Sequence, residues 1–135
     1  MSDVHTIRFQ ASDGSLGTLT VEVADVPPWK LVVSGGTLHG RSFEGRDLFE
    51  SLVALRSELE RAGCRLLCAG ARIDAFPSSM SRSMGAARRV YITHLGRPAT
   101  DTINIFDEAQ PGSTGTVEQQ KEFHKKWIRS LNKLR

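Results

Sequence analysis

Arginine and serine side chains gather in one central segment, residues 71–89, and these residue types suit the binding of phosphate. The cations of interest are Arg82, Arg88 and Arg89, and the hydroxyl groups are those of Ser79, Ser81 and Ser83. Guanidinium and hydroxyl groups donate hydrogen bonds to phosphate oxygens, so the segment fits a phosphate ligand or an RNA backbone. The structural alternative is that the serines cap short turns and the arginines pair with Asp74 or Asp107.

Two methionines in the same segment indicate a second kind of chemistry, contact with another protein. Met80 and Met84 lie four residues apart among polar neighbours. Because exposed methionine side chains are costly in water, they either cover the core from a short helix or contact a partner. On the second interpretation the candidate partner-binding residues of this loop are Arg72, Asp74, Ser79, Met80, Arg82 and Arg88.

The positive charge of the chain is concentrated at its C-terminal end. The sequence has 18 Lys and Arg against 15 Asp and Glu, a net charge of +3. Residues 121–135 hold six cations and one anion, a net +5, so the preceding residues carry −2. This distribution argues against a nucleic acid-binding face spread over the domain. Cations recur every fourth residue, which predicts a basic ridge on one helix face, and three of them join the candidate partner-binding residues: Lys121, Lys125 and Arg129. Lys133 continues the ridge.

Histidine and cysteine residues show no pattern typical of a metal site or a catalytic site. The four histidines lie at no metal-ligand spacing, and the sequence lacks Gly-x-Ser-x-Gly, the P-loop and the dinucleotide-binding pattern. Cys64 and Cys68 are expected on one face of a strand, about 13 Å apart at roughly 3.3 Å per residue, too far to bridge. We therefore expect core thiols, no metal, no cofactor and no catalytic residue, with a metal or redox role for the thiols as the alternative.

Length and hydropathy set the class of protein. A chain of 135 residues with 39% hydrophobic residues fits one globular domain, residues 1–135. No apolar run reaches the roughly 18 residues of a membrane span, and the first residues lack the pattern of a signal peptide. We expect a cytoplasmic protein that does not enter a membrane. The sequence does not indicate its oligomeric state.

The N-terminal region, residues 1–36, reads as antiparallel strands. Ile7 and Phe9 alternate on one run and Leu19 and Val21 on the next, with Asp13-Gly14 between them as a tight-turn pair. Residues 29–34 resume as a third strand. Residues 37–45 stay unassigned, with a short strand near 37–39 as one interpretation.

A helix over residues 47–62 is the clearest element of the middle region. Its apolar stripe is formed by Leu48, Leu52, Leu55, Leu59 and Ala62, and its solvent side by Glu50, Arg56, Glu58 and Arg61. Asp47 with Glu50 fits an acidic capping box, and Gly63 suits the end of the helix. Residues 64–69 are predicted as a central strand on which this helix packs.

The last third predicts a hairpin and a second helix. Residues 88–94 and 102–106 read as paired strands, and a helix follows over 116–134. Thr116 and Gln119 form a capping box at its start. Its buried stripe is predicted to be Phe123, Trp127, Leu131 and Leu134. The fold class is therefore α+β, with a mostly antiparallel sheet of five to six strands covered by two helices.

A set of short motifs in the C-terminal two thirds, from about residue 47 to 131, carries a family resemblance. The motifs are LLCAGAR at 66–72, FPSSM at 76–80, Arg82, Met84-Gly85, RVY at 89–91, IFD at 105–107, TVEQ at 116–119, and Trp127. In these motifs the chain resembles small bacterial cytoplasmic proteins encoded beside polymorphic toxins of the Rhs type. The resemblance implies an immunity protein, not an enzyme, that binds and neutralises a cognate bacterial toxin domain. It identifies neither the toxin activity nor the contact residues.

Three functional hypotheses follow. The first is a toxin-binding immunity protein that uses either the 72–89 loop or the basic ridge of the last helix. The second is an RNA- or phosphate-ligand-binding module that uses Arg82, Arg88 and Arg89, and it predicts a steep dependence of binding on salt. The third is a small enzyme, which requires titratable groups that converge in a pocket.

Overall fold

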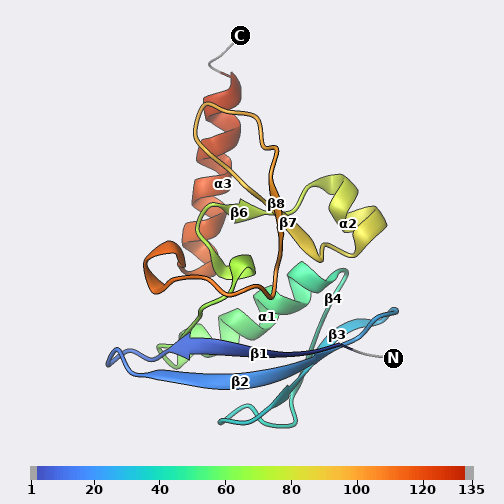
Figure 1. Ribbon diagram of the computed structural model, residues 1–135, viewed down its shortest axis with the longest axis vertical. Coiled ribbons are helices and arrows are strands. Elements are labelled where there is room, and N and C mark those ends of the chain that lie inside the picture. Colours follow the sequence, from blue (N-terminus) through green and yellow to red (C-terminus); the bar gives the residue numbers. More distant parts are fainter. Residues whose placement is uncertain (1–2, 133–135) are drawn as a thin grey trace.

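Eight strands in two antiparallel sheets and three α-helices form residues 3–132, the part of the chain that the computed structural model describes (Figure 1). The larger sheet contains β1 (Asp3–Gln10), β2 (Leu16–Val23), β3 (Trp29–Ser34), β4 (Ser42–Gly45) and β5 (Arg65–Leu66). The smaller sheet contains β6 (Ala75–Phe76), β7 (Arg89–Ile92) and β8 (Thr102–Asn104). The helices are α1 (Leu48–Arg61), α2 (Ser79–Gly85) and α3 (Val117–Asn132), and single 3-10 turns lie at Ala69–Ala71 and Pro111–Ser113. The predicted α+β class is confirmed.

The N-terminal hairpin follows the sequence prediction. β1 and β2 pair antiparallel with Ile7 opposite Leu19, and Gly14 takes the positive φ that the turn between them requires. At the tip, the hydroxyl and amide of Ser15 both donate to the Asp13 carboxylate and lower its pKa. The five strands run in the order β4-β3-β2-β1-β5. The large sheet is therefore built mainly from the first 45 residues.

Two strand predictions differ from the structure. The strand near 37–39 does not form, because residues 36–40 make the tight turn that leads into β4, which pairs with β3 instead. The predicted central strand 64–69 is also wrong. Its β5 has two residues and lies at the sheet edge, because the chain leaves the sheet and enters the 3-10 turn at Ala69–Ala71. Cys64 and Cys68 consequently lie on either side of a short edge strand.

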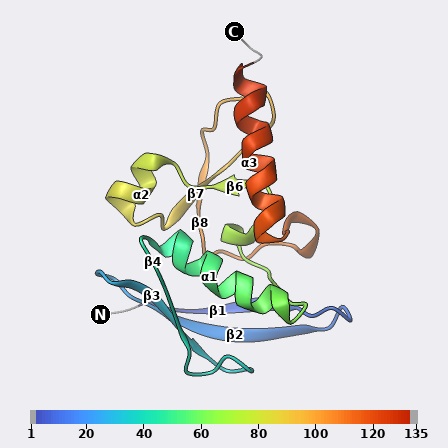
Figure 2. The same cartoon turned by 180° about the vertical axis from the view of Figure 1, so that it is seen from behind.

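Helix α1 lies between two layers, with the five-stranded sheet on one side and the smaller sheet with α3 on the other (Figures 1 and 2). Its leucines are buried, while Ala62 is the exposed C-terminal cap. The Asp47 carboxylate accepts from the amide of Glu50, as the capping pattern predicted. One hydrophobic cluster continues from the sheet through α1 to Val90 and Ile105 of the upper layer. The two layers therefore share a core.

The double cover explains one wrong prediction on α1. Arg56 was expected in solvent, yet its residue surface is only 2% exposed. A helix on a single sheet would leave that side free, but here the 3-10 turn at Ala69–Ala71 and the start of α3 cover it. The side chain is stabilised by hydrogen bonds rather than by water.

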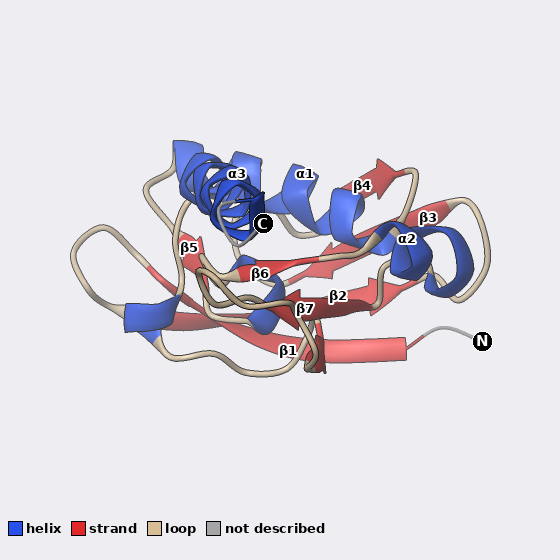
Figure 3. Cartoon of the chain, turned by 90° about the horizontal axis from the view of Figure 1, so that it is seen from above, coloured by secondary structure: helices blue, strands red, loops and turns tan. Residues whose placement is uncertain are grey.

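The upper layer holds the other predicted elements. β7 pairs antiparallel with β8, which confirms the second hairpin, and β6 pairs with β7 on its other edge. Helix α3 stands upright beside this small sheet, and α2 projects from the opposite side, as the view from above also shows (Figure 3). Helix α1 lies on the large sheet, and α3 packs on β6 of the small sheet. Helices α1 and α3 therefore contact each other while they pack on different sheets.

Helix α3 begins where it was predicted to begin. The Thr116 hydroxyl accepts from the amide of Gln119, and the Gln119 amide oxygen accepts from the Thr116 N–H. Phe123, Trp127 and Leu131 are half-buried rather than buried, because only the small sheet and a loop cover this side. Lys133 and Leu134, predicted as ridge and stripe residues, lie outside the described residues.

Candidate functional site

A cleft of about 270 Å³ lies where α1, α2 and α3 meet, and we call it the α1/α3 cleft. Its floor is apolar and its rim is polar and mainly cationic. The apolar floor residues are Phe49, Val53, Phe76 and Val117, the rim residues are Arg46, Glu50, Arg82 and Lys121, and the buried Gln120 lies at the base. An apolar hollow with a few polar groups at its edge is the usual form of a binding site.

A buried hydrogen-bond network fixes the distance between α1 and α3. The Arg56 guanidinium donates to the amide oxygen of Gln120 at 2.7 Å, to the Gly115 carbonyl at 3.1 Å and to the Gly70 carbonyl at 3.2 Å. Burial lowers the pKa of Arg56 from its ordinary value, and Cys68 and Glu60 partly oppose this shift. One turn further along α1, the Glu60 carboxylate accepts from the amide of Val117, at the positive end of the α3 dipole. The cleft is therefore held open by side chains from both helices.

Arg82 of α2 forms one wall of the cleft. Its guanidinium donates to the buried Asp47 carboxylate at 2.7 Å. It also lies 5.4 Å from the ring centre of Phe49 and 5.6 Å from that of Phe76, within the range of cation–π attraction. Asp47 thus caps α1 with one oxygen and holds α2 with the other. The predicted partners Asp74 and Asp107 are not those of Arg82.

Replacing Asp47 separates these two roles. Asp47→Ala removes both the cap and the Arg82 partner, so we expect it to lower the free energy of unfolding by about 1–2 kcal/mol. Asp47→Asn keeps a cap but not the charge, and we expect it to lose about half as much. Urea denaturation followed by tryptophan fluorescence measures both variants. A loss near zero for Asp47→Asn would show that the Arg82 pair contributes nothing, whereas equal losses would show that the cap contributes nothing.

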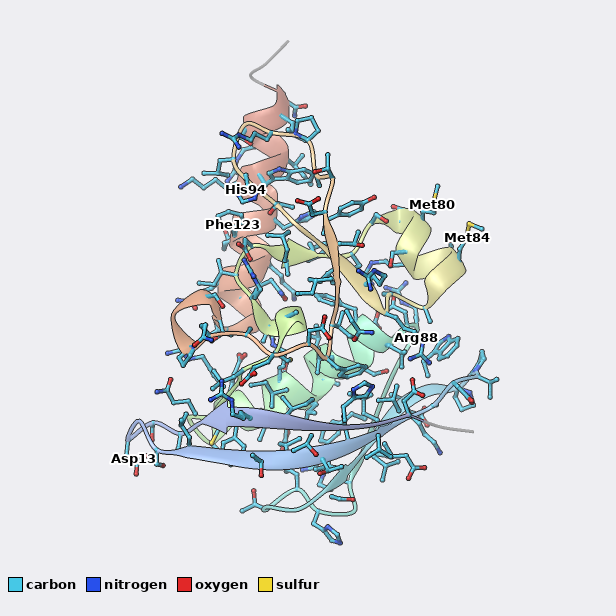
Figure 4. The ribbon with its side chains drawn as sticks, viewed as in Figure 1. Asp13, Met80, Met84, Arg88, His94 and Phe123 are labelled. Carbon is cyan, nitrogen blue, oxygen red and sulfur yellow. The ribbon has the colours of Figure 1, made fainter. Side chains whose placement is uncertain are left out.

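Helix α2 presents its methionines to solvent. Met80 is 70% exposed and Met84 is 82% exposed, and both point away from the body of the protein (Figure 4). The Ser78 hydroxyl accepts from the amide of Ser81 at the start of the helix. The short helix is confirmed, but the interpretation that its methionines cover the core is wrong. The small residues Ala86 and Ala87 make the buried contact of this segment instead.

The other predicted loop residues form separate ion pairs and hydrogen bonds. Arg72 donates to both carboxylate oxygens of Asp74 at 2.8 and 2.9 Å. Arg88, labelled in Figure 4, pairs with Asp3 of β1 and donates to the Ala24 carbonyl. Ser79 is exposed on α2 beside Arg82 in a shallow hollow that continues from the cleft.

The phosphate-binding residues of the sequence hypothesis therefore have separate partners. Arg82 pairs with Asp47 and Arg88 with Asp3, while Arg89 donates to the hydroxyl and carbonyl of Thr102. The three guanidinium groups are held by different elements. The structure does not bring them together on one acceptor site.

The basic ridge of α3 is exposed, but its members have different surroundings. Lys121 lies at the cleft rim, and no carboxylate among the described residues pairs with it. Lys125 pairs with Glu122 at 3.4 Å, one turn further along. Arg129 borders a second, open hollow on α3 together with Phe123 and Glu118. Lys121 is thus the ridge residue that belongs to the α1/α3 cleft.

Histidines are distributed over separate parts of the fold. His124 stacks on Phe76 with ring centres 3.8 Å apart, and burial, with a smaller contribution from Arg82, lowers its pKa from the ordinary value. His5 stacks on Phe106, and His39 accepts from the amide of Gly35. Within residues 3–132, no group of three His, Cys, Asp or Glu side chains is placed to hold a metal ion. The same residues include no helix that is long and apolar enough to cross a membrane.

The two cysteine thiols differ in accessibility. Cys68 is completely buried, and burial raises the pKa of its thiol to about 11, whereas Cys64 is half-buried at the sheet edge. Because the thiolate is the reactive form, we expect Cys68 to be inert in the folded protein. Titration with a thiol reagent at pH 8 should modify one thiol rapidly and the second only after denaturation. Rapid modification of both thiols would contradict the buried position of Cys68.

No protein-family model and no curated protein matches this chain. The α1/α3 cleft must therefore be interpreted from its own chemistry.

Sequence reasoning found two of the rim residues of the cleft, Arg82 and Lys121, and missed its floor. Phe49 and Val53 belong to α1 and Val117 belongs to α3. Residue spacing in the sequence does not predict how these two helices pack against each other. Arg46 precedes α1 and had no motif to mark it. The available signal was the apolar Phe49 and Val53, which lie outside the leucine stripe of α1.

Proposed function

We propose that this protein is a non-catalytic immunity protein that binds a cognate bacterial toxin domain in the cytoplasm and neutralises it. The observation that carries the proposal is the exposed methionine pair of α2, Met80 and Met84. Their neighbours Ser79 and Ser83 are exposed as well, so the helix presents an apolar surface with polar edges. Such a surface is typical of contacts between proteins.

The position of α2 supports the same function. The helix is held to the body by the Arg82 pair with Asp47 and by the Ser81 hydroxyl, which donates to the Arg89 carbonyl at 2.8 Å. A contact surface that is already rigid loses less conformational entropy when a partner binds. The α1/α3 cleft lies directly beside it, because Arg82 belongs to both. Helix α2 thus carries the methionines on its outer side and contributes Arg82 to the cleft.

The experiment is co-expression with the toxin domain encoded by the neighbouring reading frame. We expect a stable complex in a pull-down and rescue of growth. Met80→Ser with Met84→Ser should weaken the complex at least about tenfold, because the double variant removes the exposed apolar contact. Leu16→Ser is the matched control, since Leu16 is 56% exposed at the far hairpin. It should leave binding unchanged.

Two results would overturn the proposal. One is the absence of both a complex and growth rescue with a folded protein. The other is nucleic acid that remains bound on purification and dissociates steeply with salt, which would favour the RNA- or phosphate-binding alternative.

Thermal melting of the double variant checks that its fold is intact. Because neither methionine is buried, we expect its stability to change by less than about 0.5 kcal/mol.

A further inference from the structure

We propose that the α1/α3 cleft binds an aromatic or large aliphatic side chain of the partner that is flanked by carboxylates. This inference rests on the proposed function and identifies the chemistry of the partner surface. The apolar floor would receive the side chain, and the cationic rim would pair with the acidic residues beside it.

The size of the cleft suits a single inserted side chain. Its volume is about 270 Å³, at the small end of ligand pockets, which span roughly 300–1,000 Å³. Phe49 and Phe76 meet edge to face on its floor, with ring centres 5.4 Å apart. Large apolar anchors that enter such hollows, with a polar rim around them, supply much of the affinity of protein interfaces. The floor therefore suits an inserted anchor residue.

The charges of the rim determine which charged groups of the partner are favoured beside the anchor residue. Three cations line the cleft, Arg46, Arg82 and Lys121, against one carboxylate, that of Glu50. Glu50 pairs with Arg46 at 3.1 Å and Asp47 neutralises Arg82. Lys121 has no carboxylate partner among the described residues, so it remains available to an acidic group of the partner. A carboxylate is favoured at this rim and a cation is disfavoured.

Helix α3 offers a matched pair of variants. Lys121→Glu reverses the charge at the cleft rim. Lys125→Glu makes the same change one turn further along, outside the cleft. If the whole basic ridge is the binding surface, both variants weaken binding. If the cleft is the binding site, Lys121→Glu weakens binding at least about tenfold and Lys125→Glu changes it little.

The first experiment uses a peptide and does not need the toxin. Acetyl-Asp-Phe-Asp-amide is titrated into the ¹⁵N-labelled protein, and the amide signals of Val53, Val117 and Lys121 are followed by NMR. Two control peptides are used. Acetyl-Asn-Phe-Asn-amide lacks the carboxylates, and acetyl-Asp-Gly-Asp-amide lacks the apolar anchor side chain. We expect these three signals to shift with the first peptide, and the affinity to fall with each control peptide and with Lys121→Glu. Equal binding of the three peptides, or no shift at the cleft, would overturn the proposal.

The second experiment measures how Lys121→Glu and Lys125→Glu affect the toxin complex. It separates this inference from the proposed function. If the methionine variants weaken the complex while Lys121→Glu does not, the cleft proposal is wrong and the immunity function stands. If no toxin complex forms but the acidic peptide binds at the cleft with the expected charge dependence, the immunity function is wrong and the ligand preference of the cleft stands.

Discussion

Replacing Arg56 with methionine is expected to lower the free energy of unfolding by about 2–4 kcal/mol. Methionine fills the volume of the alkyl chain but donates no hydrogen bond. The Gly115 carbonyl and the Gln120 amide oxygen would lose their donor, whereas the Gly70 carbonyl would keep the Gln120 amide group as its donor. Each buried polar group left without a partner costs about 1–3 kcal/mol. Relief of the buried charge offsets part of that sum.

Two further variants make this prediction specific. Arg56→Lys keeps the positive charge but cannot reach all three acceptors, so we expect a smaller loss, about 1–2 kcal/mol. Arg61→Met is the matched control on the same helix, because its side chain is 78% exposed, and it should cost less than about 0.5 kcal/mol. Urea denaturation measures all three variants. A stability of Arg56→Met equal to that of Arg61→Met would show that the network is dispensable.

The network also connects stability to the candidate site. Arg56 and Gln120 lie beneath the α1/α3 cleft, and Gln120 itself lines it. The loss of their contact should shift the amide signals of Val53 and Val117 even where the variant stays folded. The same peptide titration would then report weaker binding, without any change in the residues at the rim.

Local patterns in the sequence predicted the elements well where one or two neighbouring residues determine the geometry. Asp13-Gly14 predicted the first turn, and the Thr116–Gln119 pair predicted the start of α3. Local patterns did not predict where an element lies in the tertiary structure. The apolar run at 64–69 predicted a central strand, because periodicity alone does not distinguish a strand from another buried segment.

Arg56 shows why the site could not be predicted in full. Its spacing from the leucines of α1 is that of a solvent residue on a helix that packs on one sheet. It becomes buried because a second layer, from residues 69–71 and 115–120, closes over the same helix. The cleft is a product of that second layer. Of the residues that line it, the sequence analysis singled out only the two cations Arg82 and Lys121.

Gly45 supplies the second large effect, since β4 and α1 approach each other there at backbone distance. A Cβ atom at this position would lie 2.6 Å from the backbone nitrogen of Ser51 and 2.8 Å from the carbonyl carbon of Glu50. The first turn of α1 cannot yield easily, because the Ser51 hydroxyl donates to the Trp29 carbonyl of β3. Gly45→Ala must therefore separate β4 from α1, and we expect a loss of about 2–3 kcal/mol.

Gly85→Ala is the control of opposite sign. Gly85 lies in α2, and a Cβ there meets nothing within 4 Å, so alanine should stabilise the helix by up to about 1 kcal/mol. Thermal melting of the two variants should therefore move in opposite directions. Gly45→Ala should also displace the neighbouring Arg46 and weaken the binding of acetyl-Asp-Phe-Asp-amide. Gly85→Ala should leave that binding unchanged. A Gly45→Ala protein as stable as the parent would mean that β4 and α1 are further apart than the structure places them.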